Sequence, residues 1–295
     1  MSVAAGDQPP TVDPSAVLAW GDAALRDLPW RATRDPWAVL VSEVMAQQTG
    51  VERVVGYYTA FLDRFPAPAA CAAAPAGEVV RLWTGLGYNR RAVNLHRCAV
   101  AVAERHGGRL PADLAALLAL PGIGPYTARA VLAFAFERQV GVVDTNVGRV
   151  LARLSGRPLT VTEAQAAADA LVPAGWAWLW NQAVMELGAT VCRRRGPRCP
   201  ACPVRSGCAW ARAGLAGPDP ADGSAGVSLG QSRFAGSDRQ GRGRLVDAMC
   251  RAPVVHADLP VVMGWPGDPA RATRVAAGLV ADGLAVDDGT ALALP

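Results

Sequence analysis

Four cysteines crowded into residues 192–208 constrain this chain more than any other feature. They are Cys192, Cys199, Cys202 and Cys208, separated by six, two and five residues. Four thiolates at such short spacing can surround one iron–sulphur cubane, whereas zinc sites more often present two separated Cys-x-x-Cys pairs. The spacing therefore predicts a [4Fe-4S] cluster, with zinc as the alternative.

The loop between these cysteines is rich in arginine. It reads Arg193-Arg194-Arg195-Gly196-Pro197-Arg198, and Arg205 follows. A charged run of this kind can simply be a solvated loop. A loop pinned by metal ligands, however, is preorganised to meet phosphates, and each phosphate it neutralises releases a counterion. We therefore expect a structural cluster that shapes a DNA-binding loop, in which Arg194 and Arg195 contact the backbone, rather than an electron carrier.

Composition sets wider bounds on the class of protein. A chain of 295 residues with 51% hydrophobic content can bury a substantial core and has room for about two domains. The net charge is +4, and every one of the 29 basic residues is arginine, because the sequence contains no lysine. No apolar run approaches the ~18 residues of a membrane span, and residues 1–17 do not resemble a signal peptide. We therefore expect a cytoplasmic monomer with no membrane partner.

The pattern of apolar residues divides the chain into zones. From about residue 14 to 210 apolar positions recur at helical spacing, so this stretch reads as nearly all helix. Residues 211–233 are rich in Gly, Ser, Ala, Asp and Pro and look like a linker. After it, two helices are expected at 242–250 and 269–282, followed by a turn at 287–289. The predicted organisation is an N-terminal segment with a first helix (1–27), a core (28–210), the linker, and a small winged-helix-like module (234–295).

A glycine-rich turn lies between two expected helices. Residues 120–127 read Leu-Pro-Gly-Ile-Gly-Pro-Tyr-Thr, with helical segments at 114–119 and 126–136. Gly122 and Gly124 permit a tight turn, and a proline at the start of the second helix leaves neighbouring amides pointing outward. Such amides can hold a phosphate without reading base sequence. The alternative is an ordinary glycine turn between packed helices.

Two carboxylates stand out as candidates for catalysis. Glu43 lies in the apolar helical stretch 41–49 with no arginine close in sequence, so burial there would raise its pKa, as a general acid requires. Asp144 follows the apolar residues 140–143 and opens an amphipathic helix. The plain alternatives are a surface helix position for Glu43 and a helix N-cap for Asp144.

Residues 28–210 closely resemble the MutY-type adenine DNA glycosylases of the endonuclease III superfamily. The resemblance rests on segments that agree in order and spacing: Leu28-Pro29-Trp30-Arg31, Val41-Ser42-Glu43-Val44-Met45, Gln47-Gln48-Thr49, Gly85-Leu86-Gly87-Tyr88, the 120–127 turn, Asp144-Thr145-Asn146-Val147, and Glu186-Leu187-Gly188-Ala189 before the four cysteines. It covers about two-thirds of the chain. It implies a mainly α fold with two lobes, DNA in the cleft, a helix-hairpin-helix at 120–127 and an iron–sulphur loop.

The resemblance also implies roles for single residues. Glu43 would protonate the adenine ring, Asp144 would stabilise the resulting oxocarbenium ion, and Tyr126 would hydrogen-bond near that centre. The residues expected to bind substrate are Trp30, Arg31 and Glu186 around the flipped adenine, Gln48 and Tyr88 in the base stack, and Thr49 against the opposite purine. Core packing remains the alternative for Trp30 and Tyr88.

The sequence departs from this family in places that bear on the opposite base. Asn89 replaces an aromatic residue often found after Tyr88, and beyond residue 211 there is no long β-rich domain of the kind that many members use to recognise 8-oxoguanine. We therefore expect adenine removal from double-stranded DNA opposite both 8-oxoguanine and guanine. The C-terminal module is expected to add only backbone affinity, through Arg239, Arg242 and Arg244.

Two rival functions remain open at the level of sequence. The first is a related glycosylase for oxidised pyrimidines, mismatched thymine or alkylated bases. Tyr126 stands where a lysine marks bifunctional lyases, which predicts a monofunctional enzyme. The second is a non-enzymatic DNA-binding or redox-sensing iron–sulphur protein, which the presence of both Glu43 and Asp144 disfavours.

Overall fold

The computed structural model describes residues 12–224 and 233–295, and it is mainly helical with a few short strands. The chain folds into two compact units. The first comprises Met1–Arg34 and Pro125–Gly230, and the second comprises Asp35–Gly124 and Gln231–Pro295. The N-terminal helix therefore joins the part of the chain that carries the cysteine loop, and the C-terminal module joins residues 35–124. The mainly α fold expected from the sequence is confirmed.

The first unit is built from helices and short helical turns. Its elements are α1 (Pro14–Ala24), η1 (Pro29–Arg31), α8 (Pro125–Phe134), α9 (Thr145–Ser155), α10 (Val161–Leu171), α11 (Ala177–Thr190), η2 (Cys199–Ala201) and α12 (Ala209–Arg212). Several of these begin at residues that favour helix starts. Thr160 and Glu163 form a reciprocal capping box at α10, and Asp13 accepts a hydrogen bond from the Ser15 amide at α1.

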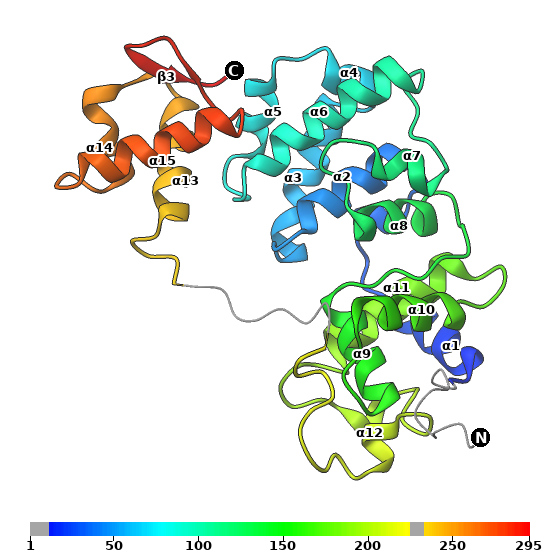
Figure 1. Cartoon of the computed structure of the whole chain (residues 1–295). Coiled ribbons are helices and arrows are strands. Elements are labelled where there is room, and N and C mark those ends of the chain that lie inside the picture. The colour runs from blue at the N-terminus through cyan, green and yellow to red at the C-terminus, as the bar shows by residue number, and fades with distance from the viewer. Residues whose placement is uncertain (1–11, 225–232) are drawn as a thin grey trace. The chain divides into compact units, whose positions relative to one another are not determined.

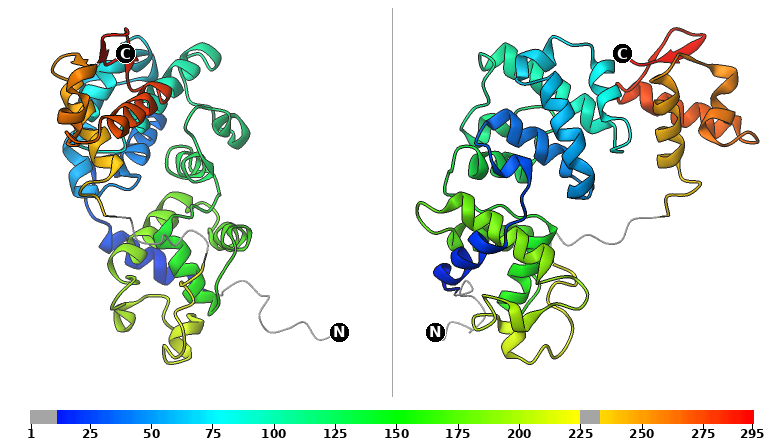
Figure 2. Two further views of the ribbon diagram at one scale, coloured as in Figure 1. Left: turned by 60° about the vertical axis from the view of Figure 1, so that its left-hand side comes forward. Right: turned by 180° about the vertical axis from the view of Figure 1, so that it is seen from behind.

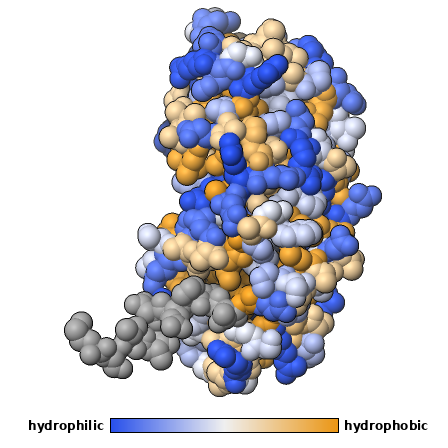
Figure 3. All heavy atoms as spheres, turned by 90° about the vertical axis from the view of Figure 1, so that its right-hand side faces the viewer, coloured by the Kyte–Doolittle hydropathy of each residue, from blue (hydrophilic) through white to orange (hydrophobic). Residues whose placement is uncertain are grey.

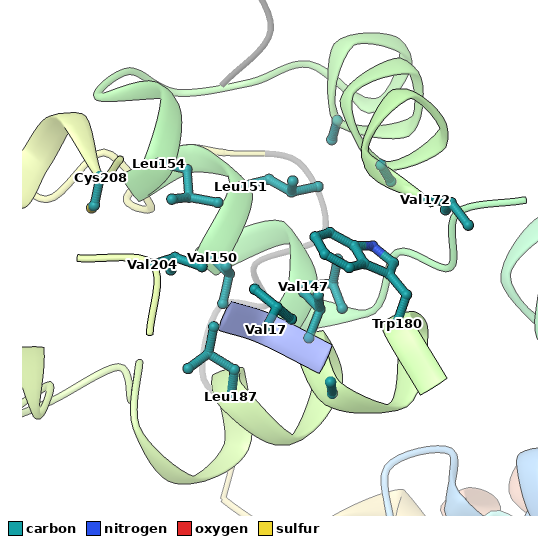
Figure 4. Close-up of a cluster of buried hydrophobic side chains, with 14 of the residues drawn as sticks. Val17, Val147, Val150, Leu151, Leu154, Val172, Trp180, Leu187, Val204 and Cys208 are labelled. Carbon is teal, nitrogen blue, oxygen red and sulfur yellow. The ribbon is translucent and has the colours of Figure 1, made fainter. Parts of the chain in front are cut away.

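One apolar core holds the first unit together. Helix α1 packs on α11, and α11 packs on α9. Figure 4 shows their side chains converging, with Val17 from α1 among the α9 residues and Trp180 and Leu187 from α11. Val204 and Cys208 of the cysteine loop belong to the same cluster. The loop is therefore packed onto the helices and does not extend freely into solvent.

The second unit begins with six helices. They are α2 (Pro36–Ala46), α3 (Val51–Arg64), α4 (Pro68–Ala72), α5 (Ala76–Trp83), α6 (Arg90–Arg105) and α7 (Leu114–Leu118). Aromatic side chains fill the centre: the Phe61 ring lies 5.1 Å from Phe65 and 6.2 Å from Trp83, centroid to centroid. The Trp37 indole packs beside them and donates its N–H to the Phe65 carbonyl oxygen at 2.9 Å. Burying that donor with a partner avoids the cost of an unsatisfied polar group.

The small C-terminal module expected from the sequence contains three α-helices, one more than predicted, and a small sheet. It runs α13 (Asp238–Met249), β1 (Val254–Val255), η3 (His256–Asp258), α14 (Leu259–Met263), α15 (Pro269–Ala281), β2 (Val286–Asp287) and β3 (Ala291–Ala293). The strands form an antiparallel sheet in the order β1-β3-β2. Figures 1 and 2 show α13, α14 and α15 grouped beside this sheet.

Specific contacts fasten this module to the helices of its own unit. The Gly77 amide at the start of α5 donates to the Pro295 carbonyl oxygen at 2.7 Å. Asp282, just after α15, forms an ion pair with Arg90 of α6 at 3.5 Å and another with Arg242 of α13. The Thr84 hydroxyl lies 3.1 Å from the Cys250 thiol. These contacts join the two parts of the second unit at several places.

The segment expected to be a linker is only partly described. Residues 225–232 lie outside the described part of the chain. Before them, Ala221 and Ser224 are buried, and Asp219 forms an ion pair with Arg153 of α9. The stretch 219–224 is thus packed against the first unit, because its polar residues find buried partners there.

The surface is mixed in character. On the face drawn in Figure 3, hydrophobic residues are interspersed with hydrophilic ones. Within residues 12–224 and 233–295, no helix combines the length and the apolarity that a membrane crossing requires.

Candidate functional site

Asp144 is held in place at the start of helix α9. Its Oδ1 accepts hydrogen bonds from the amides of Asn146 at 2.9 Å and Val147 at 2.7 Å, and its Oδ2 accepts from the Asn146 side chain at 3.0 Å. The N-cap role is therefore real. Burial raises the pKa of this carboxyl above its ordinary value, and the three hydrogen bonds oppose that rise only in part. Asp144 is a fixed, partly desolvated carboxylate.

A hydrogen-bonded chain runs from Asp144 to the cysteine loop. The Arg149 guanidinium, one turn along α9, donates to the Asn146 side-chain oxygen at 2.9 Å. It also donates to the carbonyl oxygens of Gly188 at 2.6 Å and Cys192 at 2.7 Å. Arg149 is 6% exposed. One buried cation thus connects the segment after Asp144, helix α11 and the first cysteine.

Gly188 explains how α9 and α11 approach each other at this point. A Cβ atom at Gly188 would lie 2.6 Å from the Asn146 Cβ and 2.9 Å from the Asn146 carbonyl oxygen. Real Cβ atoms do not come that close to backbone atoms, so a larger residue would push the helices apart. The glycine in the Glu-Leu-Gly-Ala segment is therefore a packing requirement of the site.

Glu186 anchors a polar cluster that includes two of the residues expected to line the adenine pocket. Its side chain is fully buried and accepts from Arg26 at 2.6 Å and from Arg31 at 2.8 Å. Arg31 also donates to the Gln182 side chain at 2.8 Å. Trp30 stands next to Arg31 in η1 and is buried. The structure thus brings Arg31 and Glu186 into direct contact, and Trp30 is the residue before Arg31.

The turn predicted at 120–127 runs into the first residues of helix α8, and Tyr126 is the second residue of that helix. Gly122 has a φ of 76°, a left-handed conformation that favours glycine, and a Cβ there would meet the Asn94 side chain at 2.6 Å. Gly122 itself is exposed, Gly124 and Tyr126 are half-buried, and α8 begins at Pro125. The expected combination of a tight turn and a proline at the first helical position is present.

Glu43 occupies the buried face of α2 in the second unit. Only 7% of it is exposed, and all of its helix neighbours from Trp37 to Met45 are buried. The alternative of a surface position is therefore wrong, because α2 is apolar all round and packs against α3 and α6. Glu43 belongs to the second unit, whereas Asp144, Tyr126, Trp30, Arg31 and Glu186 belong to the first.

Gln48 and Tyr88 come together in the second unit. The Tyr88 hydroxyl donates to the Gln48 side-chain oxygen at 3.5 Å. Both residues have positive φ, 57° and 50°, which costs non-glycine residues on the order of 1–3 kcal/mol each. Such strain concentrates where function needs it, and both side chains are exposed.

Arg91 holds the segments around Gln48 and Tyr88 in place. The sequence alone did not indicate this role. Its guanidinium donates to the carbonyl oxygens of Val44, Met45 and Gln47 at 2.8, 2.8 and 2.6 Å, and to the Thr49 hydroxyl at 3.1 Å. It also donates to the Gly87 carbonyl oxygen at 2.9 Å. Burial lowers the pKa of Arg91 to about 10, which leaves it charged at neutral pH. No pattern in the sequence marks an arginine as a carbonyl clamp.

The four cysteines of the loop line one small apolar pocket. Cys192, Cys199, Cys202 and Cys208 share it with Arg153 and Trp210. The Arg153 guanidinium donates to the Cys192 sulphur at 3.3 Å and stacks on Trp210 at 4.7 Å. Over the described residues, no three His, Cys, Asp or Glu side chains are already drawn together at metal-ligand distances. Arg193, Arg194 and Arg195 are exposed on the same loop.

The remaining cysteines are placed differently. Cys71 and Cys98 are buried in the second unit, and burial raises the pKa of both thiols to about 12. Thiols this weakly acidic stay protonated, so they are poor metal ligands. Cys250 lies in the C-terminal module.

The module arginines are not equivalent. Arg242 pairs with Asp282, and Arg244 donates to the Met263 carbonyl oxygen at 3.4 Å. Arg239 instead donates to the Tyr88 hydroxyl at 3.1 Å. Arg242 and Arg244 therefore have partners inside the module, and Arg242 shares the Asp282 carboxylate with Arg90.

Comparison with known proteins identifies the family of this chain. Residues 41–173 match the family model described as "HhH-GPD superfamily base excision DNA repair protein". The chain is 45% identical to the adenine DNA glycosylase of Mycolicibacterium smegmatis over 281 residues, which cover 93% of this chain and 92% of that protein. It is 42% identical to the human adenine DNA glycosylase over 208 residues, covering 65% of this chain but only 38% of the human protein.

A solved structure supports the fold. The structure of a thermostable thymine-DNA glycosylase aligns with a TM-score of 0.63 and 30% identity, covering 68% of this chain and 95% of that one. The mycobacterial match extends over nearly the whole chain, so it includes much of the C-terminal module. The chain belongs to the adenine DNA glycosylases, within the HhH-GPD superfamily of base excision DNA repair proteins.

Proposed function

We propose that this protein hydrolyses the N-glycosidic bond of adenine mispaired with 8-oxoguanine or guanine in double-stranded DNA, without cleaving the strand. The observation that carries the proposal is Asp144, a partly desolvated carboxylate fixed by three N–H donors. A carboxylate so placed stabilises a cation that forms beside it, because the surroundings screen the charge weakly and no reorganisation is needed.

Glu43 is the proposed general acid. It donates a proton to a ring nitrogen of adenine, so that the base departs with the electron pair of the bond to C1′ as a neutral leaving group. Glu43 is buried among the buried residues of α2, so it is shielded from bulk water. The sugar left behind is an oxocarbenium ion.

Asp144 then stabilises that ion until water adds at C1′ and releases a proton. This division of labour between two carboxyl groups follows glycosidase chemistry. Tyr126 is proposed to hydrogen-bond near the same centre. Glu186 and Arg31 are proposed to meet the polar edge of the extruded adenine, with Trp30 against its face, because buried charged groups held by mutual hydrogen bonds keep a fixed geometry.

The loop cysteines are proposed to hold a [4Fe-4S] cluster. The donor set fits: four thiols line one pocket, and Arg153 already directs an N–H toward one sulphur. When bound, the cluster supplies a rigid cross-link rather than a step of the reaction. This chain's own part is to present Arg194 and Arg195 to DNA phosphates from the pinned loop, while the Gly122–Gly124 turn offers backbone amides.

Single-turnover base release tests the proposal. Duplexes carrying adenine opposite 8-oxoguanine, guanine or thymine, and thymine opposite guanine, are incubated with excess protein, and free base and strand breaks are measured separately. We expect adenine release opposite the two purines without strand breaks. Release of thymine from the thymine–guanine duplex and none of adenine would replace this function with that of the thymine-DNA glycosylase to which the chain is similar.

A further inference from the structure

We propose that the C-terminal module and the Gln48–Tyr88 region together form a binding site for one unstacked DNA base and its flanking phosphates. The site is a groove of about 1010 Å³ within the second unit. Residues from both parts of that unit line it, among them Gln48, Tyr88 and Asn89 from one part and Phe234, Arg239 and Gly243 from the module. The proposal rests on the proposed glycosylase function, because it needs a base displaced near Tyr88.

The groove contains a stacking platform. The Arg239 guanidinium lies over two aromatic rings, 5.4 Å from the Phe234 centroid and 5.9 Å from the Tyr88 centroid. It also donates to the Tyr88 hydroxyl at 3.1 Å. Phe234 is 54% exposed, so part of its ring is accessible from the groove. Aromatic rings interleaved with arginine are the standard means of holding unpaired bases.

The charge of the lining suits a phosphate-bearing ligand. Five arginines and one aspartate line the groove. Arg90 and Arg242 pair with that aspartate, Asp282, and Arg91 is committed to carbonyl oxygens. The lining therefore carries a net charge of +4, and Arg53 is exposed. The volume stands at the upper end of the roughly 300–1,000 Å³ of small-molecule sites, so it accommodates a nucleotide with its neighbouring backbone.

One polar atom in the lining of the groove could still accept a hydrogen bond. The Asn89 side-chain oxygen is buried and has no hydrogen-bond partner within residues 12–224 and 233–295. The N–H groups on the edge of a purine would satisfy it after a small rotation of the side chain. The second aromatic ring of the groove is Phe234 of the module.

This site changes the role expected for the C-terminal module. The sequence suggested backbone affinity alone, spread over three arginines. In the structure, Arg239 contacts both Phe234 and Tyr88, and Tyr88 is a residue expected to enter the base stack. The module therefore contributes to recognition of a base, and its contribution depends on which base is displaced.

Binding measurements on cleavage-resistant duplexes test the inference. The adenine carries a 2′-fluoro sugar, which resists loss of the base because the fluorine destabilises the oxocarbenium ion. We compare Phe234→Ala and Arg239→Ala with the unaltered chain, on duplexes with guanine or 8-oxoguanine opposite adenine. Each variant should weaken binding by about 5- to 150-fold, the measured range for one stacked base. Arg251→Ala is the matched control, because Arg251 is an exposed arginine of the same module that does not line the groove.

Abasic duplexes identify the strand that supplies the base. If the base comes from the opposite strand, the loss caused by Phe234→Ala disappears when the position opposite adenine is abasic. If it comes from the adenine strand, the loss persists there and disappears when the neighbour of adenine is abasic. An unchanged affinity for Phe234→Ala on every duplex, or an equal loss on fully paired DNA, overturns the inference. Adenine release by the unaltered chain is measured in parallel, so that a failure of the proposed function is seen separately.

Discussion

At the scale of single residues, the proposed mechanism assigns different tasks to Glu43 and Asp144. Glu43→Gln keeps the shape of the side chain but cannot donate a proton. We expect single-turnover adenine release to fall by about 10²- to 10⁴-fold, while duplex affinity stays within about twofold. Filter binding and base release measured on the same protein preparation check this. A variant that releases adenine at the normal rate removes Glu43 from the mechanism.

Asp144 gives a pH dependence with a definite sign. In the proposed mechanism the ionised form stabilises the oxocarbenium ion, and burial raises the pKa of this carboxyl above 3.8. The rate should therefore fall as pH drops through a value above 3.8. Asp144→Asn should lose on the order of 10²- to 10³-fold in rate at neutral pH. Its pH–rate profile should also lack that acid limb.

The Asp144→Asn variant should lower the rate of base release far more than the free energy of unfolding. A carboxyl whose pKa is raised in the folded protein lowers the free energy of unfolding as pH rises above the ordinary value, because the folded state binds the proton more tightly than the unfolded state. Asparagine is as good an N-cap as aspartate. We expect Asp144→Asn to change the free energy of unfolding at pH 7 by no more than about 1 kcal/mol. A loss of several kcal/mol would make the residue chiefly structural.

The sequence indicated the candidate site residues, but not the side chains that hold them in place. Glu43 and Asp144 stood in recognisable segments, and the burial of Glu43 followed from the apolar helix around it. Arg91, Arg149 and Arg26 could not be found, because an arginine that binds carbonyls or a distant carboxylate has no local signature. Their partners lie up to 160 residues away in the chain.

At the scale of elements, the crossing of α9 and α11 depends on Gly188. Gly188→Ala places a Cβ against the Asn146 backbone and should cost roughly 1–3 kcal/mol in the free energy of unfolding, the usual range for overpacking. It should also lower the rate of base release, because Asn146 holds Asp144. Gly56→Ala is the control: it lies inside α3 with nothing within 4 Å, and should be neutral or stabilising. Urea titrations of both variants give the comparison, and equal midpoints would contradict the packing argument.

The cysteine loop makes a prediction about metal content. The purified protein should be brown and contain about four irons per chain. Cys202→Ala should lose most of this iron, whereas Cys250→Ser should retain it, because Cys250 lies in the other unit. Iron analysis and visible absorption check both variants. Stoichiometric zinc in a colourless protein would favour the alternative reading of the four cysteines.

Element positions followed from the sequence where periodicity and turn residues agreed. The expected helix at 269–282 is α15, and the turn at 287–289 joins β2 to β3. The grouping of elements could not be predicted. The N-terminal helix packs on α11, and the C-terminal module joins residues 35–124, because burial between segments far apart in the chain decides these contacts.

At the scale of the whole molecule, the absence of lysine constrains the chemistry of strand cleavage. A β-lyase needs an amine that attacks the sugar C1′ and forms a Schiff base, and in proteins this is usually a lysine with a lowered pKa. All 29 basic side chains here are arginine, and a guanidinium stays protonated and is a poor nucleophile. Met1 supplies the one α-amine of this sequence.

Borohydride trapping tests that constraint over the entire chain. After base release from an adenine–guanine duplex, reduction should give no covalent protein–DNA adduct at a yield comparable to the adenine released. Alkali should be needed to break the strand at the abasic product. Acetylating the α-amine of Met1 should leave both results unchanged. An adduct that forms in step with adenine release and disappears on acetylation would show that the terminal amine acts as a nucleophile. The reaction would then no longer end at hydrolysis.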